Sequence, residues 1–214
     1  NYYGLSMKGY NQAHEHVSFN DKLRALNEKQ TYAYLDQKDT KLFYKLYFSI
    51  LDYVNGLEQI IPNKKIDPNI YIEPDELVNL IEVFWKEKDR FIDDYVQKNP
   101  MNLTYRNLNI IKDFKYGMRK NFLLAVFEKN YTVLNDEGIN YMVKGLNENL
   151  DQFIPAEKTP MLIQTAIMPF NGTIIYDGFI STADMQLSQE LISKAFEDYS
   201  YGQKIYSLLP KNMN

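Results

Sequence analysis

The dipeptide Asn171-Gly172 lies between two apolar runs, residues 161–170 and 173–180, and limits what this part of the chain can form. A two-residue hairpin loop needs positive φ at both positions, and Asn-Gly tolerates that backbone better than most pairs. The register of such a hairpin places Pro169 in a non-hydrogen-bonded pair, where its missing N–H costs nothing. The sequence therefore predicts an antiparallel hairpin whose first strand has a free edge or a bulge at Pro169.

Three shorter β-rich runs precede this hairpin, at residues 122–127, 131–134 and 139–143. Polar spacers separate them, and the second spacer ends in Gly138, where a three-residue hairpin loop needs a left-handed residue. Together with the Asn-Gly hairpin, these runs predict an antiparallel sheet of about five strands.

Apolar side chains in the first half recur every three or four residues, which is typical of helices with one buried face. A further helix is expected before Gly202, with Phe196 among its buried residues. Pro62 ends the second of the expected helices, and the third ends before Pro100. Four helices are expected before the sheet, over residues 20–34, 40–61, 74–99 and 104–118. The first starts at Asn20 or Asp21, the second is capped by Thr40, and the third has Pro74 in its first turn.

The fold class predicted from these patterns is α+β. Residues 1–118 form a helical region that packs on the antiparallel sheet and C-terminal helix of residues 119–214. A chain of 214 residues with 45% hydrophobic content suits one compact unit of this kind. The sole tryptophan, Trp85, lies on an apolar stripe and is expected to be mostly buried.

Composition excludes several kinds of site. The chain has no cysteine, so disulfides, thiolate zinc sites and cysteine nucleophiles are ruled out. A net charge of −4 gives no overall basic surface for nucleic acid. The most apolar stretch, residues 42–61, is interrupted by charges, and the start of the chain has no leader-like apolar run. We expect a soluble, cytoplasmic protein that is not associated with a membrane and has no cofactor or metal.

The segment TAIMPFNGTIIYDGFI, residues 165–180, resembles a stretch found in uncharacterised bacterial proteins. Their form is an aliphatic run, Pro-Phe, a polar residue and glycine, two isoleucine-like residues, and Tyr-Asp-Gly. The similarity extends over about residues 70–210 and includes Trp85 and the Val143-Lys-Gly-Leu146 stretch. Some of these proteins also carry a cysteine-rich zinc motif of the SecA C-terminal type, which this chain lacks. The resemblance implies an architecture and no known activity.

Tyr176 and Asp177 are binding-site candidates because the resemblance centres on them and because Asp177 is embedded in apolar sequence. The alternative is structural, since a carboxylate at a strand end or turn can accept backbone N–H bonds. We expect the structural role, in which Asp177→Asn lowers stability and leaves binding unchanged.

Lys112, Lys115 and Arg119 are the second set of candidates. On a helix over residues 104–118 and its continuation they share one side, which could hold a phosphate or an acidic partner. Solvent-exposed helix faces often look the same, so this stretch alone does not indicate nucleic-acid binding.

No pattern predicts a catalytic or metal site. The two histidines, His14 and His16, lack the further ligands that metal sites need. The acidic residues between Glu87 and Asp94 alternate with cations and are expected to form ion pairs on a solvent face.

Three classes of function follow from these observations. The leading one is a non-enzymatic binding or protein-interaction module that uses the helical face or the sheet edge near Pro169. The second is an enzyme of unrecognised type that uses carboxylates and tyrosines. The third is a nucleic-acid-associated protein that uses the basic helix.

Overall fold

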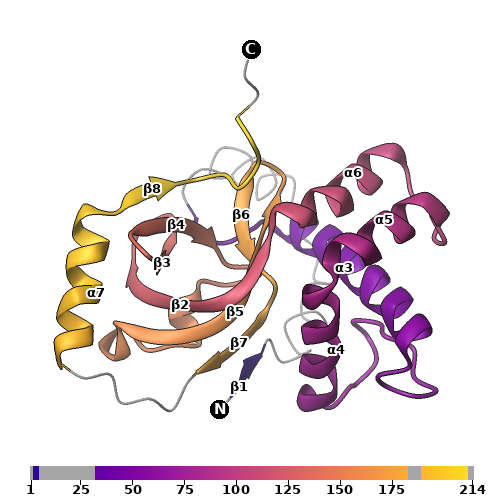
Figure 1. Ribbon diagram of the computed structural model, residues 1–214, viewed down its shortest axis with the longest axis horizontal. Coiled ribbons are helices and arrows are strands. Elements are labelled where there is room, and N and C mark those ends of the chain that lie inside the picture. Colours follow the sequence, from indigo (N-terminus) through magenta and orange to yellow (C-terminus); the bar gives the residue numbers. More distant parts are fainter. Residues whose placement is uncertain (1, 5–31, 183–188, 212–214) are drawn as a thin grey trace, which may run out of the picture.

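The computed structural model describes residues 2–4, 32–182 and 189–211, and it has an α+β architecture as predicted (Figure 1). The first half of the chain forms a group of helices on one side of a strongly curved sheet, and a C-terminal helix lies on the other side. None of the helices in this part of the chain is long and apolar enough to cross a membrane. The helices are α3 (Gln37–Glu58), α4 (Pro74–Lys86), α5 (Lys88–Lys98), α6 (Tyr105–Asp113) and α7 (Gln189–Tyr201).

The longest helix, α3, begins earlier than the sequence indicated. The side chain of Asp36 accepts a hydrogen bond from the Asp39 N–H and caps it. Thr40 is therefore not the cap, and its hydroxyl donates to the Leu146 carbonyl instead. The helix ends at Glu58, followed by a left-handed C-cap at Gln59, so it stops three residues before the predicted end at residue 61.

The expected helix over residues 20–34 lies mostly outside the described residues. Its last part is not helical, because Tyr34 forms a parallel bridge with Gly145. The amide of Gly145 donates to the Ala33 carbonyl, and the Leu35 amide donates to the Gly145 carbonyl. This segment therefore pairs with a residue that lies far along the chain, which local periodicity does not reveal.

The predicted third helix is two helices, α4 and α5, which meet at Glu87, a residue with a non-helical backbone (φ −126°, ψ 31°). The predicted fourth helix is shorter than expected, because α6 ends at Asp113 and a 3₁₀ turn, η2 (Phe114–Tyr116), follows it. A Cβ atom at Gly117 would lie 2.8 Å from the Trp85 ring and 2.7 Å from the Ile167 carbonyl. Glycine therefore fits best at this position, where the backbone is extended (φ −78°, ψ 168°) and the chain passes from η2 into the sheet.

The sheet has eight strands in the described residues and is mixed, whereas about five antiparallel strands were predicted. Strands β2, β3 and β4 form an antiparallel meander, and β5 and β6 form a hairpin. β5 pairs antiparallel with β2, and β6 pairs parallel with β4, so these five strands close on themselves. The strands are β1 (Tyr2–Gly4), β2 (Met118–Phe127), β3 (Thr132–Asp136), β4 (Ile139–Lys144), β5 (Met161–Phe170), β6 (Thr173–Tyr176), β7 (Phe179–Thr182) and β8 (Gln203–Ile205).

Three strands extend this closed sheet. β7 continues from β6 and pairs with β5 and with β1, and β8 pairs parallel with β4. Two short 3₁₀ turns, η3 (Leu150–Gln152) and η4 (Ala156–Lys158), connect β4 to β5.

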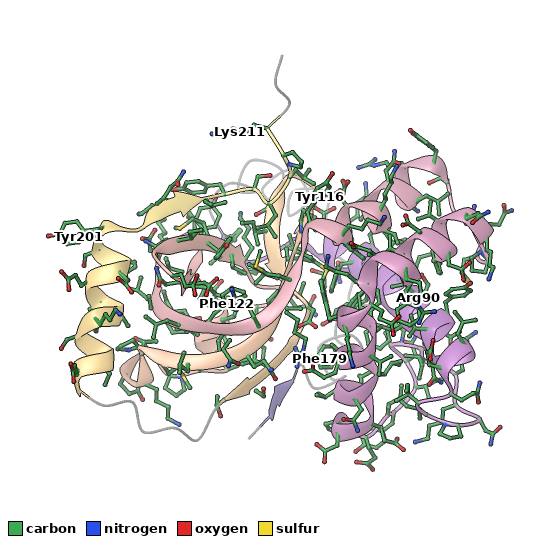
Figure 2. The ribbon with its side chains drawn as sticks, viewed as in Figure 1. Arg90, Tyr116, Phe122, Phe179, Tyr201 and Lys211 are labelled. Carbon is green, nitrogen blue, oxygen red and sulfur yellow. The ribbon has the colours of Figure 1, made fainter. Side chains whose placement is uncertain are left out.

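The two faces of the sheet bury different side chains. Phe122 lies inside the curve of the sheet, where it packs edge-on against Tyr141 and joins the core shared with the helices (Figure 2). The opposite side of β2, β3 and β4, here called the outer face, is covered in part by α7. Phe196 of α7, which was predicted to be buried, is 45% exposed. The outer face buries Leu123, Ala125, Val133 and Met142, with Ala195 and Tyr199 of α7 packed against them.

The hairpin prediction is confirmed. Phe170 pairs with Thr173 and Pro169 with Ile174 around the loop. The pairing of β5 with β2 stops at Ile167, so β5 has no second partner at Pro169, as predicted. Pro169 itself is buried, and the adjacent Phe170 packs edge-on against Phe43 of α3. The strand edge near Pro169 is therefore covered and does not offer a binding surface.

Replacing Gly172 with valine should lower the free energy of unfolding by about 1 kcal/mol or more, because a β-branched residue resists positive φ. The φ of Gly172 is 81°, and a Cβ there would meet no atom within 4 Å, so backbone strain is the only expected cost. Urea unfolding of both proteins would measure it.

Gly56 of α3 is the matched control, since a Cβ there also meets nothing within 4 Å. Gly56→Ala, in an exposed helical position, should raise the free energy of unfolding by about 0.5–1 kcal/mol. An unchanged stability in Gly172→Val would contradict the hairpin loop.

Candidate functional site

The Tyr176-Asp177-Gly178 segment interrupts the second strand of the hairpin, which was expected to run unbroken through residues 173–180. β6 ends at Tyr176 and β7 begins at Phe179, with Gly178 at a φ of 92°. Residues 177–180 lie opposite residues 165–166 of β5, so this side of the pair carries two extra residues. The resulting bulge lets β6 pair with β4 while β7 turns toward β1.

The Asp177 side chain is fully buried within this bulge. Its Oδ2 accepts a hydrogen bond from the Tyr47 hydroxyl at 3.0 Å, and its Oδ1 accepts one from the Phe179 amide at 3.1 Å. The Thr165 hydroxyl lies 3.4 Å from Oδ1 and 2.8 Å from the Phe179 carbonyl. The carboxylate thus accepts hydrogen bonds from α3 and β7, and the Thr165 hydroxyl of β5 lies beside it.

Trp85 extends this network into α4. Its indole Nε1–H donates to the Tyr47 hydroxyl at 3.0 Å, and Trp85 is only 8% exposed. The prediction that Trp85 is mostly buried is therefore confirmed. A continuous chain of hydrogen bonds runs from Trp85 through Tyr47 to Asp177, and it joins two helices to the sheet.

Arg119 is not on a helix with Lys112 and Lys115, as the sequence suggested, but on β2. Its side chain is 3% exposed, its Nε donates to Glu82 at 2.7 Å, and its Nη2 lies 3.4 Å from Gln164. The buried Nη1 has no partner among the described residues. Arg119 pairs with Ala166, which in turn lies opposite Asp177, so the guanidinium and the carboxylate belong to one row across the sheet.

Burial raises the pKa of Asp177 from 3.8 to about 6, because the charged carboxylate loses its hydration. Arg119 and the donors from Phe179 and Tyr47 oppose this effect in part. Burial and the neighbouring carboxylate also raise the pKa of Tyr47. Tyr176 is buried as well, and desolvation raises the pKa of its hydroxyl. These groups are packed within the core and could not reach a substrate without a rearrangement.

Comparison with known proteins gives no family. No protein-family model, curated protein or solved structure matches this chain. The resemblance of residues 165–180 to uncharacterised bacterial proteins therefore stays a prediction, and the site has to be judged by its own geometry.

The basic candidates are dispersed, because the helix that was expected to align them ends early. Lys112 is exposed on α6, whereas Lys115 lies in η2 and forms an ion pair with Asp93. Arg119 is buried on β2 beside Glu82. The predicted basic helix face over these three residues is therefore wrong.

The acidic residues of α5 and its junction with α4 form ion pairs as predicted, with Arg90, Lys88, Lys115 and Lys98 as their partners. His14 and His16 lie outside the described residues. Among the residues that the structure describes, no three His, Cys, Asp or Glu side chains are grouped to hold a metal ion.

Sequence reasoning missed a second group, at the end of the outer face. Lys144, the last residue of β4, is 8% exposed, and its Nζ donates to the Tyr32 carbonyl at 3.0 Å. The ammonium also lies 5.3 Å from the centre of the Tyr131 ring. Burial lowers the pKa of Lys144, because no carboxylate compensates for its lost hydration.

Four tyrosines surround this lysine or adjoin its partners. Tyr131 and Tyr206 pack edge-on with ring centres 5.4 Å apart, and Tyr32 and Tyr34 are 5.1 Å apart. We call Tyr32, Tyr34, Tyr131 and Tyr206 the tyrosine cluster. Its members come from three segments, before α3, before β3 and after β8. The only sequence signal was a lysine that directly follows a β-rich run.

The stability of the protein should depend on pH through Asp177. Between about pH 4 and pH 6 the folded protein keeps a proton at Asp177 that the unfolded chain has released. The contribution of Asp177 to the free energy of unfolding therefore falls as the pH rises through this window, by up to about 3 kcal/mol. Urea unfolding at pH 4.5, 5.5, 6.5 and 7.5 would measure it against Asp177→Asn.

We expect Asp177→Asn to be less stable than the wild type at pH 4.5, because the amide nitrogen of asparagine cannot accept a hydrogen bond. The deficit should shrink toward pH 7.5, since only the wild type has the titrating group. A deficit that grows with pH would mean that Arg119 and the hydrogen bonds lower the pKa of Asp177 below its ordinary value.

Trp85→Ala should lower the free energy of unfolding by roughly 3–5 kcal/mol, because it empties a large volume between α4, Gly117 and Tyr47. Tyr71→Ala, at a residue that is 68% exposed, is the control and should change stability by less than about 0.5 kcal/mol. As Trp85 is the only tryptophan, its emission should be blue-shifted and poorly quenched by iodide. A red-shifted, freely quenched emission would show that the indole is accessible.

Proposed function

We propose that this protein is a non-enzymatic binding module that recognises another protein through the tyrosine cluster beside Lys144. The observation that carries the proposal is the gathering of four tyrosines from three separate segments at one end of the outer face. Two of their rings are substantially exposed, Tyr32 at 41% and Tyr206 at 49%.

The chemistry of this surface suits protein recognition. Tyrosine is enriched at interfaces because it offers a large, rigid apolar ring and a hydroxyl that can form hydrogen bonds. Its two side-chain torsions also lose little entropy when a partner immobilises the ring. Tyr206 directly follows β8, which lies beside β4, so its backbone has a fixed position relative to Lys144 (Figure 1).

The alternatives receive less support from the described residues. Asp177 has the raised pKa that a general acid needs, but its side chain is enclosed by α3, α4 and the sheet. A nucleic-acid surface would need several cations in a row, and Lys115 and Arg119 are each paired with a carboxylate.

The test is affinity capture from a native lysate, followed by mass spectrometry, with the wild type and two variants. Tyr206→Ala alters the tyrosine cluster. Tyr201→Ala is the control, because Tyr201 is 87% exposed and projects from the end of α7 (Figure 2). A partner protein should be enriched by the wild type and by Tyr201→Ala, and its recovery should fall at least about tenfold with Tyr206→Ala.

Equal recovery with both variants would place recognition elsewhere on the surface. Turnover of a small molecule by the wild type that Asp177→Asn abolishes without lowering the melting temperature would replace the binding proposal with an enzymatic one.

A further inference from the structure

Lys144 carries a charge that no acidic side chain balances among the described residues. Lysine is rarely buried to this extent without a partner, because removing the ammonium from water is costly. Its Nζ donates to one carbonyl, that of Tyr32, and faces the ring of Tyr131. An ammonium has three N–H donors, so these contacts leave donor capacity unused.

The neighbouring cation, Lys204, is exposed and has a carboxylate partner. Lys204 on β8 is 48% exposed and forms an ion pair with Glu128 at 3.2 Å. Glu128 is thus engaged by Lys204, whereas Lys144 is a buried cation beside the tyrosine cluster with no carboxylate partner in the described part of the chain.

We propose that Lys144 binds a carboxylate from an acidic segment of a partner protein, while the tyrosine cluster packs against an apolar side chain next to that carboxylate. This inference rests on the proposed function and names the chemistry of the partner. An incoming carboxylate supplies the missing counter-charge, and the rings of Tyr131 and Tyr206 exclude water around the ion pair, which strengthens it.

The geometry favours a carboxylate over a phosphate. Phosphate sites usually gather several cations, an arginine fork or a row of backbone N–H groups at a helix N-terminus. Here a single buried ammonium faces the Tyr131 ring, and Lys204 on β8 is already paired with Glu128. One ammonium matches the single charge of a carboxylate.

The experiment uses the full chain with ¹³C-labelled tyrosine rings and a matched pair of probes, acetyl-Phe-Asp-amide and acetyl-Phe-Asn-amide. The two dipeptides have nearly the same shape and differ in charge. Titration of each would give a dissociation constant from the shifts of the Tyr131 and Tyr206 ring signals, in the millimolar range expected for small ligands. The aspartate probe should bind about tenfold more tightly to the wild type.

Lys144→Met should remove this preference while retaining weak binding of both probes, because methionine keeps the apolar stem and loses the charge. Lys144→Gln is a second uncharged variant in case the first does not fold. Lys204→Met is the matched control, and it should keep the preference.

The outcomes separate the two proposals. If both probes bind equally to the wild type, or if the preference survives in both Lys144 variants, the carboxylate inference is wrong and the tyrosine cluster stays the recognition surface. If neither probe shifts the Tyr131 and Tyr206 signals, both proposals are wrong. If acetyl-Phe-phosphoserine-amide binds about tenfold more tightly than the aspartate probe, the site takes phosphate and the carboxylate inference is overturned.

Discussion

The buried carboxylate of Asp177 is the interaction on which the arrangement of helices and sheet depends. A buried charged group needs hydrogen-bond donors, and here they come from Tyr47 of α3 and from the Phe179 amide of β7. The Tyr47 hydroxyl links it to Trp85, so any shift of α3 or α4 against the sheet would break hydrogen bonds that water cannot replace. The cost of burying the carboxylate is offset only in one relative position of these elements, which makes that position specific.

The same residue explains how one continuous stretch pairs with three other strands. A strand can be hydrogen-bonded on two sides only, and the segment after Asn171-Gly172 must pair with β4, β5 and β1 in turn. The bulge at Asp177 and Gly178 changes the direction of the chain between the first and the last of these partners. The closed sheet therefore has a core side, continuous with the helices, and an outer face that α7 covers in part. The surface that we propose for recognition lies at the end of this outer face, where Lys144 pairs with Ile175 of β6.

Features that depend on neighbouring residues were predictable from the sequence, whereas contacts between distant segments were not. The Asn-Gly hairpin, its register and the burial of Trp85 followed from neighbouring residues. Arg119 was misplaced because helical spacing continues through Met118, whereas α6 ends at Asp113 and the chain enters β2 after the 3₁₀ turn η2. The parallel pairs of β4 leave no mark in a single sequence, since alternation does not show strand direction. Lys144 and the tyrosine cluster were missed for a related reason, because their members become neighbours only when the sheet closes.

The hydrogen bond between Tyr47 and Asp177 joins residues that are 130 positions apart. A chain leaving the ribosome exposes α3 long before its carboxylate partner has been synthesised. During that time the Tyr47 hydroxyl has no carboxylate to bind, and the apolar face of α3 has no sheet to pack on. Closing a loop of this length carries an entropic cost, and topologies dominated by such distant contacts fold slowly. The helical half is therefore the part of the nascent chain that needs protection from aggregation until residue 177 emerges.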